Sequence, residues 1–326
     1  MPEPFFKRSM TESLTVCVTG AAGYIGSRVV SDFLDEGHEV RAVDDFSYGD
    51  IHEIDGVEVE ELDVRNRGRL REVLEDVDAV CHLAAVSGVE ECQDRMEYAF
   101  DVNVGGTENV AWLCRENSLP MVFPCSMAVI GDPTEIPITS KHPRKPLNHY
   151  GFTKKMSEDD VYGLARDGFP GLVFLKSNLY GHHYVGDRRV GKATVINIFV
   201  DKALEGEPLT VHEPGTQARD FIHVKDVSRA YIDAVNHLIS SDEGAGTLPL
   251  ASGECMSVLD LAELVQDVAR DELGDAPEIE MVENPRSSEA VSDDFTVDTS
   301  EASEKIGFGA KFSVEGAVRD MLDEAN

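Results

Sequence analysis

A glycine-rich turn between an expected strand and an expected helix constrains this 326-residue chain more than any other feature. Residues Thr19–Gly26 read T-G-A-A-G-Y-I-G, after a short β-rich run and before an amphipathic stretch. Gly20 permits a tight turn, Gly23 lets the backbone approach a pyrophosphate, and Gly26 lets the helix pack on the strand. The amide groups at the helix N-terminus then face the phosphates, so the pattern predicts a dinucleotide-binding βαβ unit.

Strand-like and helix-like segments alternate along the first half of the chain. Alternation at this spacing predicts a doubly wound, parallel α/β sheet of the Rossmann kind. After about residue 177 the loops lengthen, and two further helices are expected at residues 258–273 and 314–324. The expected strands are residues 14–19, 39–43, 57–62, 79–83, 121–124 and 172–177, and the expected helices are residues 25–36, 67–74, 96–117 and 148–166, the third of them bent near Gly105.

This change of rhythm divides the chain into two parts. We expect residues 1–177 to form a nucleotide-binding Rossmann domain, with residues 1–13 as a polar extension. Residues 178–326 are expected mainly to form a smaller substrate-binding lobe, from which some segments can return to the sheet. The lobe is expected at the carboxyl edge of the sheet, where ligands bind in open α/β folds.

The charge of the chain argues against several classes of partner. Sixty-two acidic residues stand against 29 basic ones, which gives a formal net charge of −33. Such a chain repels nucleic-acid backbones and anionic lipid surfaces. No stretch approaches the roughly 20 apolar residues of a membrane span, and residues 1–13 contain no run like a signal peptide. We therefore expect a cytoplasmic protein that binds neither nucleic acid nor membrane.

The acidic residues are spread through amphipathic segments and do not form a tail. They predict a well-solvated surface, and they suggest adaptation to high intracellular salt, which screens self-repulsion within a few ångströms. The six cysteines show no C-x-x-C spacing, so reduced, structural thiols are expected. The ten histidines form no cluster with metal-ligand spacing, so no metal site is predicted.

An acidic residue ends the second expected strand. A carboxylate at Asp44 can accept hydrogen bonds from both hydroxyls of the adenosine ribose and repels a 2′-phosphate, which favours NAD over NADP. Because Asp45 stands beside it, a solvated loop carboxylate remains the alternative interpretation. Asp63 and Val64 end the third expected strand, where they can contact the adenine edge.

A tyrosine and a lysine share one face at the start of the expected helix 148–166. Tyr150 and Lys154 form a Y-x-x-x-K pair, one helical turn apart. An ammonium near the phenol, together with a cationic nicotinamide, lowers the tyrosine pKa and makes a general base. Ser126 follows the strand at residues 121–124, where its hydroxyl can bind the reacting oxygen. Taken singly, such a pair is commonly helix surface, and such a serine is commonly a cap or turn residue.

With these motifs in order, the chain resembles the extended short-chain dehydrogenase/reductases, and among them the sugar-nucleotide epimerases similar to UDP-glucose 4-epimerase. The resemblance runs from about residue 14 to residue 308. It rests on T-G-A-A-G-Y-I-G (19–26), V-D-D-F-S (43–47), L-D-V (62–64), H-L-A-A (82–85), N-V-G-G-T (103–107), C-S-M-A-V-I-G (125–131), Y-G-F-T-K (150–154), N-L-Y-G (178–181) and R-D-F-I-H-V-K-D-V (219–227).

The resemblance implies roles for individual residues. Tyr150 is implied as the base, Lys154 as its activator and a ribose ligand, and Ser126 as the partner of the substrate hydroxyl. Asn103 is implied to support the strand and helix around the cofactor. The implied contacts to NAD are Gly20, Gly23, Tyr24, Ile25, Gly26, Asp44, Asp45, Ser47, Asp63, Val64, Leu83, Ala84, Ala85, Asn103, Tyr150 and Lys154.

A nucleotide sugar is the implied substrate. Asn178 would contact it, and Arg219 and Arg286 would clamp its diphosphate, because the planar guanidinium binds phosphate oxygens through two hydrogen bonds. Family members often form homodimers through two long helices, here residues 96–117 and 148–166, and the sequence allows this.

The residues after Ser126 favour epimerisation. Dehydratases and decarboxylases of the family resemble T-D-E or T-S-E at this place, whereas this chain has Met127 and Ala128 and no carboxylate. An epimerase needs one base, a hydride acceptor and room for the sugar to turn, so C4 inversion of a UDP-hexose through a 4-keto sugar is predicted. A related sugar-nucleotide dehydrogenase or ketoreductase, or a non-enzymatic NAD-binding sensor, stays open.

Overall fold

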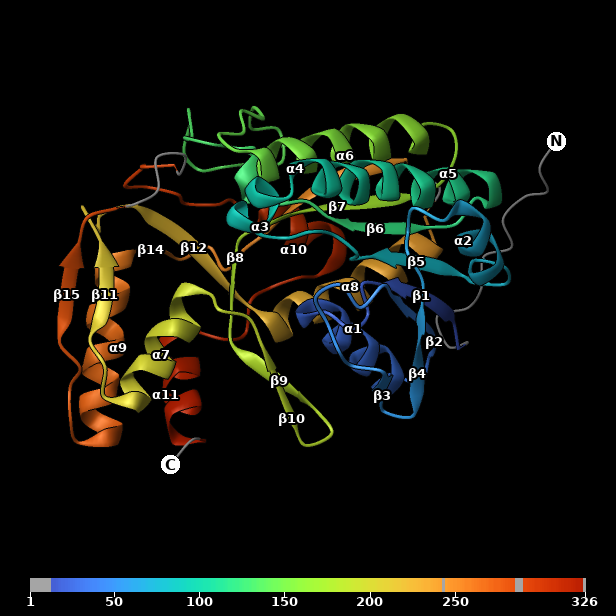
Figure 1. The fold of residues 1–326 in the computed structure, drawn as a ribbon. Helices are drawn as coiled ribbons and strands as arrows, with labels where there is room; N and C mark the ends of the chain where they lie inside the picture. Colours follow the sequence, from blue (N-terminus) through green and yellow to red (C-terminus); the bar gives the residue numbers. More distant parts are fainter. Residues whose placement is uncertain (1–12, 242–243, 285–289, 325–326) are drawn as a thin grey trace.

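An eight-stranded sheet forms the centre of the computed structural model, which describes residues 13–241, 244–284 and 290–324 (Figure 1). Its strand order is β13-β7-β6-β5-β1-β2-β4-β3. Neighbouring strands are parallel except β3 and β4, which are antiparallel at one edge. The predicted doubly wound α/β sheet is confirmed. The strands are β1 (Thr15–Thr19), β2 (Glu39–Asp44), β3 (Glu53–Ile54), β4 (Val57–Glu61), β5 (Ala79–His82), β6 (Met121–Pro124), β7 (Gly171–Lys176) and β13 (Ala245–Leu250).

Helices cover both faces of this sheet (Figure 1). On one face, buried side chains such as Leu70, Leu113 and Val161 join the strands to α2, α5 and α6. On the other face, Phe33 and Tyr231 belong to a second core that joins the strands to α1 and α8. The two cores place the sheet in the middle of three layers, so its carboxyl edge stays accessible. The helices are α1 (Tyr24–Asp35), α2 (Arg67–Val73), α5 (Thr107–Asn117), α6 (His149–Ala165) and α8 (Val224–Ile239).

The local sequence explains where α1 begins and ends. Gly23, which precedes the helix, has an extended backbone, and buried Val29, Val30 and Phe33 then recur at helical spacing. Gly37 ends the helix with φ of +83°, a conformation that glycine adopts without steric cost. The helix therefore starts directly behind the glycine turn, as the sequence predicts.

The long helix expected at residues 96–117 is divided into three parts. α4 (Met96–Phe100) and α5 are joined by a π-helical turn at Asp101–Gly106, near the predicted bend at Gly105. α3 (Val89–Asp94) precedes them and was not predicted. π-helical turns often occur at functional sites, because they redirect side chains that a regular helix would place elsewhere.

The second half of the chain contributes to the sheet and also forms a separate lobe. β13 joins the sheet beside β7, and α8 and α10 (Ser300–Ile306) cover it from the α1 side. The lobe has its own core around Phe199, Phe221 and Leu261. It contains α7 (Val195–Glu205), α9 (Val258–Leu273), α11 (Val314–Asp323) and the short strands β8 (Asn178–Tyr180), β9 (His182–Val185), β10 (Arg188–Gly191), β11 (Leu209–His212), β12 (Ala218–His223), β14 (Cys255–Ser257) and β15 (Ile279–Val282).

Two of the lobe helices, α9 and α11, were predicted from the sequence, whereas α7, α8 and strand β13 were not. Within the described part of the chain, every helix is too short or too polar to cross a lipid bilayer.

Candidate active site

A cleft of about 670 Å³ lies at the carboxyl edge of the sheet, between the glycine turn, α6 and the strands β8 to β10. It brings together most of the residues predicted to bind the cofactor and the substrate. Those that line it are Gly20, Gly23, Tyr24, Ile25, Gly26, Asp44, Asp45, Ser47, Val64, Leu83, Ala84, Ala85, Ser126, Tyr150, Lys154 and Asn178.

The glycine turn leaves no space for side chains at two of its positions. Gly20 has φ of +71°, and a Cβ there would lie 2.6 Å from the backbone nitrogen of Ala84. A Cβ at Gly26 would lie 2.0 Å from the carbonyl oxygen of Gly20. The Gly23 amide donates to that same carbonyl at 3.2 Å and closes the turn. The turn thus brings bare backbone and the N-terminus of α1 to the cleft, which suits the pyrophosphate of NAD.

Asp44 is held by the protein backbone at the end of β2. Its Oδ2 accepts a hydrogen bond from the Ala22 amide at 3.0 Å, and its Oδ1 accepts one from the Phe46 amide at 2.8 Å. The side chain is buried, and burial raises the pKa of its carboxyl group above the usual value. A buried carboxylate with a fixed orientation differs from a solvated loop acid, and its remaining lone pairs suit ribose hydroxyls.

Next to Asp44, the carboxylate of Asp45 is also held in place. Its Oδ1 accepts from the Ser47 amide at 3.0 Å, and its Oδ2 accepts from the Tyr98 hydroxyl at 3.2 Å. Ser47 and Tyr98 also hydrogen-bond each other at 2.9 Å through their hydroxyl groups. This end of the cleft is therefore an ordered set of acceptors and hydroxyls.

Asp63 and Val64 separate in the structure. Val64 lines the cleft, whereas the Asp63 carboxylate accepts from Arg65 Nε at 2.9 Å and from Nη2 at 2.5 Å. The Arg65 guanidinium holds the pKa of Asp63 below its usual value. Asp63 is not among the residues that line the cleft, because this ion pair holds its side chain elsewhere.

Tyr150, Lys154 and Ser126 meet in the cleft. Asn148 caps α6 by accepting a hydrogen bond from the Gly151 amide at 2.9 Å, which places Tyr150 in the first turn. The phenol lies near the Ser126 hydroxyl, and Lys154 Nζ donates to the Pro124 carbonyl at 3.1 Å. Burial lowers the pKa of Lys154 to about 8. The three side chains thus form a group of two hydroxyls and an amino group that can exchange a proton with a hydroxyl bound beside them.

The pKa of Tyr150 differs from the expectation. Burial raises the pKa of Tyr150 above the usual value near 10, and the nearby Ser126 hydroxyl counteracts this rise only in part. The Lys154 ammonium is not among the main groups that lower it. The sequence pattern could not reveal the desolvation, which follows from the packing around the phenol. The positive charge of an oxidised nicotinamide beside the phenol would favour the phenolate.

Asn103, implied as a support around the cofactor, does not itself line the cleft. Its Oδ1 accepts from the Val86 amide at 2.8 Å, and its Nδ2 donates to the Val86 carbonyl and to Thr153 Oγ1, each at 3.0 Å. Thr153 lies between Tyr150 and Lys154 on α6. The π-helical turn therefore directs Asn103 to join the segment after β5 to α6.

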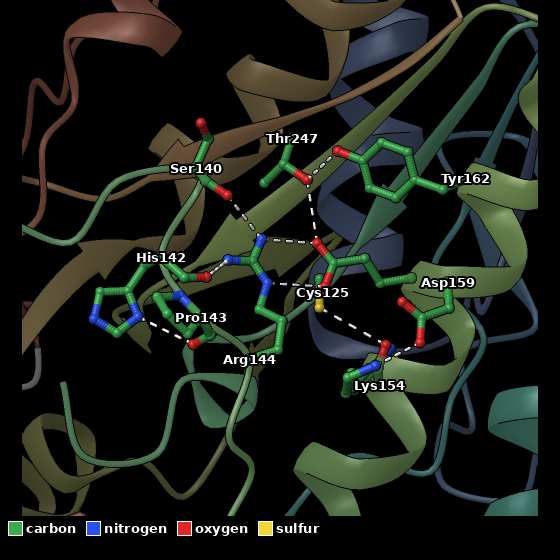
Figure 2. A network of polar contacts seen from close by, with 11 residues as sticks. Cys125, Ser140, His142, Pro143, Arg144, Lys154, Asp159, Tyr162 and Thr247 are labelled. Carbon is green, nitrogen blue, oxygen red and sulfur yellow. Dashed lines mark hydrogen bonds and ion pairs between the residues drawn. The ribbon is translucent and has the colours of Figure 1, made fainter. Parts of the chain in front are cut away.

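A buried ion pair that sequence reasoning missed holds α6 one turn after Lys154. Arg144 binds both carboxylate oxygens of Glu158, at 3.0 Å from Nε and 2.8 Å from Nη2. Thr247 of β13 donates to Glu158 at 3.2 Å, and Tyr162 hydrogen-bonds Thr247 at 2.6 Å (Figure 2). Arg144 also donates to the carbonyls of Ser140 and His142. This network joins a loop, the helix and the edge strand.

A sequence signal for this network exists in the helix. Glu158 follows Lys154 at the same four-residue spacing with which Lys154 follows Tyr150, so the three lie along one face of α6. Glu158 is buried, and a buried glutamate on the face of the reactive pair indicates a partner. The sequence does not identify Arg144 as that partner.

The two arginines predicted on the diphosphate have different outcomes. Arg219 donates to the Ala218 carbonyl at 2.6 Å and to the Ala290 carbonyl at 2.5 Å, and its guanidinium lies 5.2 Å from the Phe295 ring centre. It is not among the residues that line the cleft. Arg286 lies outside the described residues.

Four basic residues that were not predicted also line the cleft. They come from the end of β7 and from the β9–β10 hairpin and the residue after it, and they are Lys176, Arg188, Arg189 and Lys192. The sequence carries a signal for three of them, because residues 187–192 read D-R-R-V-G-K in a strongly acidic chain. Among the described residues, no group of three or more His, Cys, Asp or Glu side chains could hold a metal ion.

Comparisons with known proteins point to a single family. Residues 16–245 match the model of the NAD dependent epimerase/dehydratase family. UDP-glucose 4-epimerase 4 of Oryza sativa subsp. japonica is 29% identical over an alignment 345 residues long. The alignment covers 96% of this chain and 90% of that relative.

Solved structures give the same result. UDP-glucose 4-epimerase from Brucella ovis in complex with NAD has a TM-score of 0.83 and 25% identity, over 96% of this chain and 98% of that one. MoeE5 in complex with UDP-glucuronic acid and NAD has a TM-score of 0.81 and 26% identity, over 95% and 98% of the two chains.

Proposed function

We propose, from the premise that this chain belongs to the NAD dependent epimerase/dehydratase family and uses NAD, that it inverts C4 of a nucleotide diphosphate sugar. The observation that carries the proposal is the meeting of Tyr150, Lys154 and Ser126 in one cleft, with Met127 and Ala128 in place of a carboxylate after the serine. Relatives named UDP-glucose 4-epimerase, and a neighbour that binds UDP-glucuronic acid, support a UDP-linked sugar.

The protein's groups divide the chemistry among them. Ser126 holds the C4 hydroxyl of the sugar, and Tyr150 accepts its proton, with the Ser126 hydroxyl and the positive charge of the oxidised nicotinamide favouring the phenolate. Bound NAD supplies a hydride acceptor that can return the hydride. The 4-keto sugar turns within the cleft while its nucleotide stays bound, and Tyr150 then returns the proton to the oxygen. The product is the C4 epimer, with no net oxidation.

A panel of UDP-sugars tests the reaction. The protein is incubated with UDP-glucose, UDP-galactose and the matching uronates in the presence of NAD, and both NADH absorbance and sugar identity are followed. An epimerase converts one sugar to its C4 epimer without accumulating NADH. Stoichiometric NADH would instead identify a dehydrogenase or ketoreductase, and binding of NAD without any turnover would identify a sensor.

We also propose that a second copy of the chain covers the outer face of α4, α5 and α6. Large apolar side chains are exposed there, namely Met96, Phe100, Trp112, Phe152 and Tyr162. α4 and the start of α6 contact each other in this patch, because His149 of α6 hydrogen-bonds the carbonyl of Met96 in α4 at 3.0 Å. The His149 ring also stacks on Phe152. A patch that spans adjacent helices suits a two-fold interface. Light scattering should give a dimer that Phe152→Glu dissociates; a monomeric wild type would contradict the proposal.

A further inference from the structure

Lys176 places an amino group beside Ser126 in the cleft. It is the last residue of β7, and it pairs with Leu250 of β13 on one side. On the other side, β6 pairs with β7 in a register that matches Pro124 with Phe174. Ser126 also has an extended backbone, with φ of −145° and ψ of 147°, so the same register, continued by two residues beyond the paired strands, aligns Lys176 with Ser126. Both residues line the cleft.

The ammonium of Lys176 differs from the other cations of the cleft. Lys154 donates to the Pro124 carbonyl, Lys192 donates to Ser87 at 2.8 Å and 3.0 Å, and Arg188 and Arg189 pair with aspartates. For Lys176, no described side chain or carbonyl accepts a hydrogen bond from Nζ. The cleft thus contains one cation whose acceptor is not supplied by the described chain.

The groups around Lys176 make the protonated form of its amino group unfavourable. Lys192 and Lys154 repel it, and the Cys125 thiol is the remaining titratable group near it. Burial and these two cations lower the pKa of Lys176 to about 7. Of the 62 acidic residues in the chain, none described pairs with it. A desolvated cation without a partner is unfavourable, and an anionic ligand would remove that cost.

We propose that Lys176 binds a carboxylate on the sugar ring, so that the preferred substrate is a nucleotide-linked uronic acid. The inference rests on the proposed function, in which Ser126 and Tyr150 hold the C4 hydroxyl. In a uronic acid the carboxylate carbon is attached to C5, the neighbour of C4, so it lies on the side of the ring that faces Ser126. The diphosphate is attached to C1, on the opposite side of the ring.

The carboxylate also explains how the charge balance of the site changes on binding. Pairing with an anion restores the ammonium and raises the pKa of Lys176 from about 7 toward that of an ordinary lysine. At pH 8 the protein alone holds Lys176 mainly neutral, so a uronate should bind with uptake of a proton. Its affinity should fall as the pH rises above about 7, whereas the affinity of a neutral sugar should not follow this change.

Binding to the NAD-loaded protein tests the proposal without requiring turnover. Calorimetric titrations compare UDP-glucuronate, UDP-glucose and UDP, with wild type and Lys176→Met, in buffers of different ionisation enthalpy. We expect wild type to prefer the uronate and Lys176→Met to lower the ratio of the two sugar affinities by about 10- to 100-fold, as for a hydrogen bond to a charged group. Proton uptake at pH 8 should disappear in the variant. Lys141→Met, which removes an exposed lysine outside the cleft, is the matched control.

Each other outcome has a definite meaning. Equal weakening of UDP, UDP-glucose and UDP-glucuronate in Lys176→Met would assign the lysine to the diphosphate and overturn the proposal. A wild type without preference for the uronate would overturn it as well. If the preference and its loss are observed but no C4 epimer forms from either sugar, the proposed reaction fails while the carboxylate site stands.

Discussion

The two ends of the cleft handle their charges differently. At the end of β2, Asp44 and Asp45 are each oriented by backbone amides, and Asp45 also accepts from Tyr98. At the end of β7, Lys176 faces two other cations and has no acceptor among the described residues. The comparison teaches that the chain orients the carboxylates at one end of the cleft with its own donors, and leaves at the other end an amino group whose protonated form needs an acceptor from a ligand.

The largest effect of removing a single atom is expected on turnover, at the hydroxyl of Tyr150. Tyr150→Phe removes the hydroxyl that transfers the proton, so turnover should fall by about 10²- to 10⁴-fold, the usual contribution of a general base. NAD affinity should change little, which titration of the cofactor checks. Tyr162→Phe is the control, since that hydroxyl lies on the same helix but binds Thr247. Near-normal turnover of Tyr150→Phe would exclude the proposed mechanism.

Removal of Arg144 tests how much a buried charge loses when its partner is taken away. Arg144→Met leaves the buried Glu158 carboxylate without its cation, and breaking such a pair costs about 3–5 kcal/mol of unfolding free energy. Denaturant unfolding measures it. Arg270→Met removes an exposed pair with Asp267 and should cost less than about 1 kcal/mol. Equal effects of the two substitutions would show that burial does not control the strength of these pairs.

A smaller effect is expected at the cofactor end from the glycine turn. Gly26→Ala places a Cβ against the Gly20 carbonyl, so the turn must shift, at about 1–3 kcal/mol for an overpacked site. NAD affinity should fall by about 10- to 100-fold, as calorimetry can measure. Gly163→Ala on α6 meets no atom within 4 Å and should leave NAD affinity intact. If Gly26→Ala binds NAD like wild type, the turn is not preorganised by these close contacts.

The smallest effect is expected on thermal stability and concerns the acidic surface of the protein. Its negative charge is opposite in sign to the basic residues at the other end of the cleft. If the acidic surplus reflects adaptation to salt, molar KCl screens the repulsion and stabilises the protein. Each 1 kcal/mol gained should raise Tm by about 1–2 °C for a chain of this length. Thermal melts across a KCl series measure this, with sucrose as a control for general solvent exclusion. A Tm that falls as KCl rises would contradict adaptation to salt.

Short-range patterns predicted much of the cofactor end. The glycine turn and the acid after β2 depend on backbone conformation over a few residues, and the structure places both at the cleft. The Tyr150–Lys154 spacing is likewise a property of one helical turn. Asp63 shows the limit of this reasoning, because a neighbour two residues away, Arg65, holds its carboxylate outside the cleft.

The sequence by itself determined the alternation of strands and helices, the position of the glycine turn and the one-turn spacing of Tyr150 and Lys154, since each is encoded by local spacing. Only the tertiary structure decided that β13 joins the sheet, that Arg144 meets Glu158, and that Lys176 lies beside Ser126 without an acceptor among the described residues. It also decided the raised pKa of Tyr150. The physical reason is that strand order and desolvation arise from contacts between segments far apart in the chain, which no local pattern records.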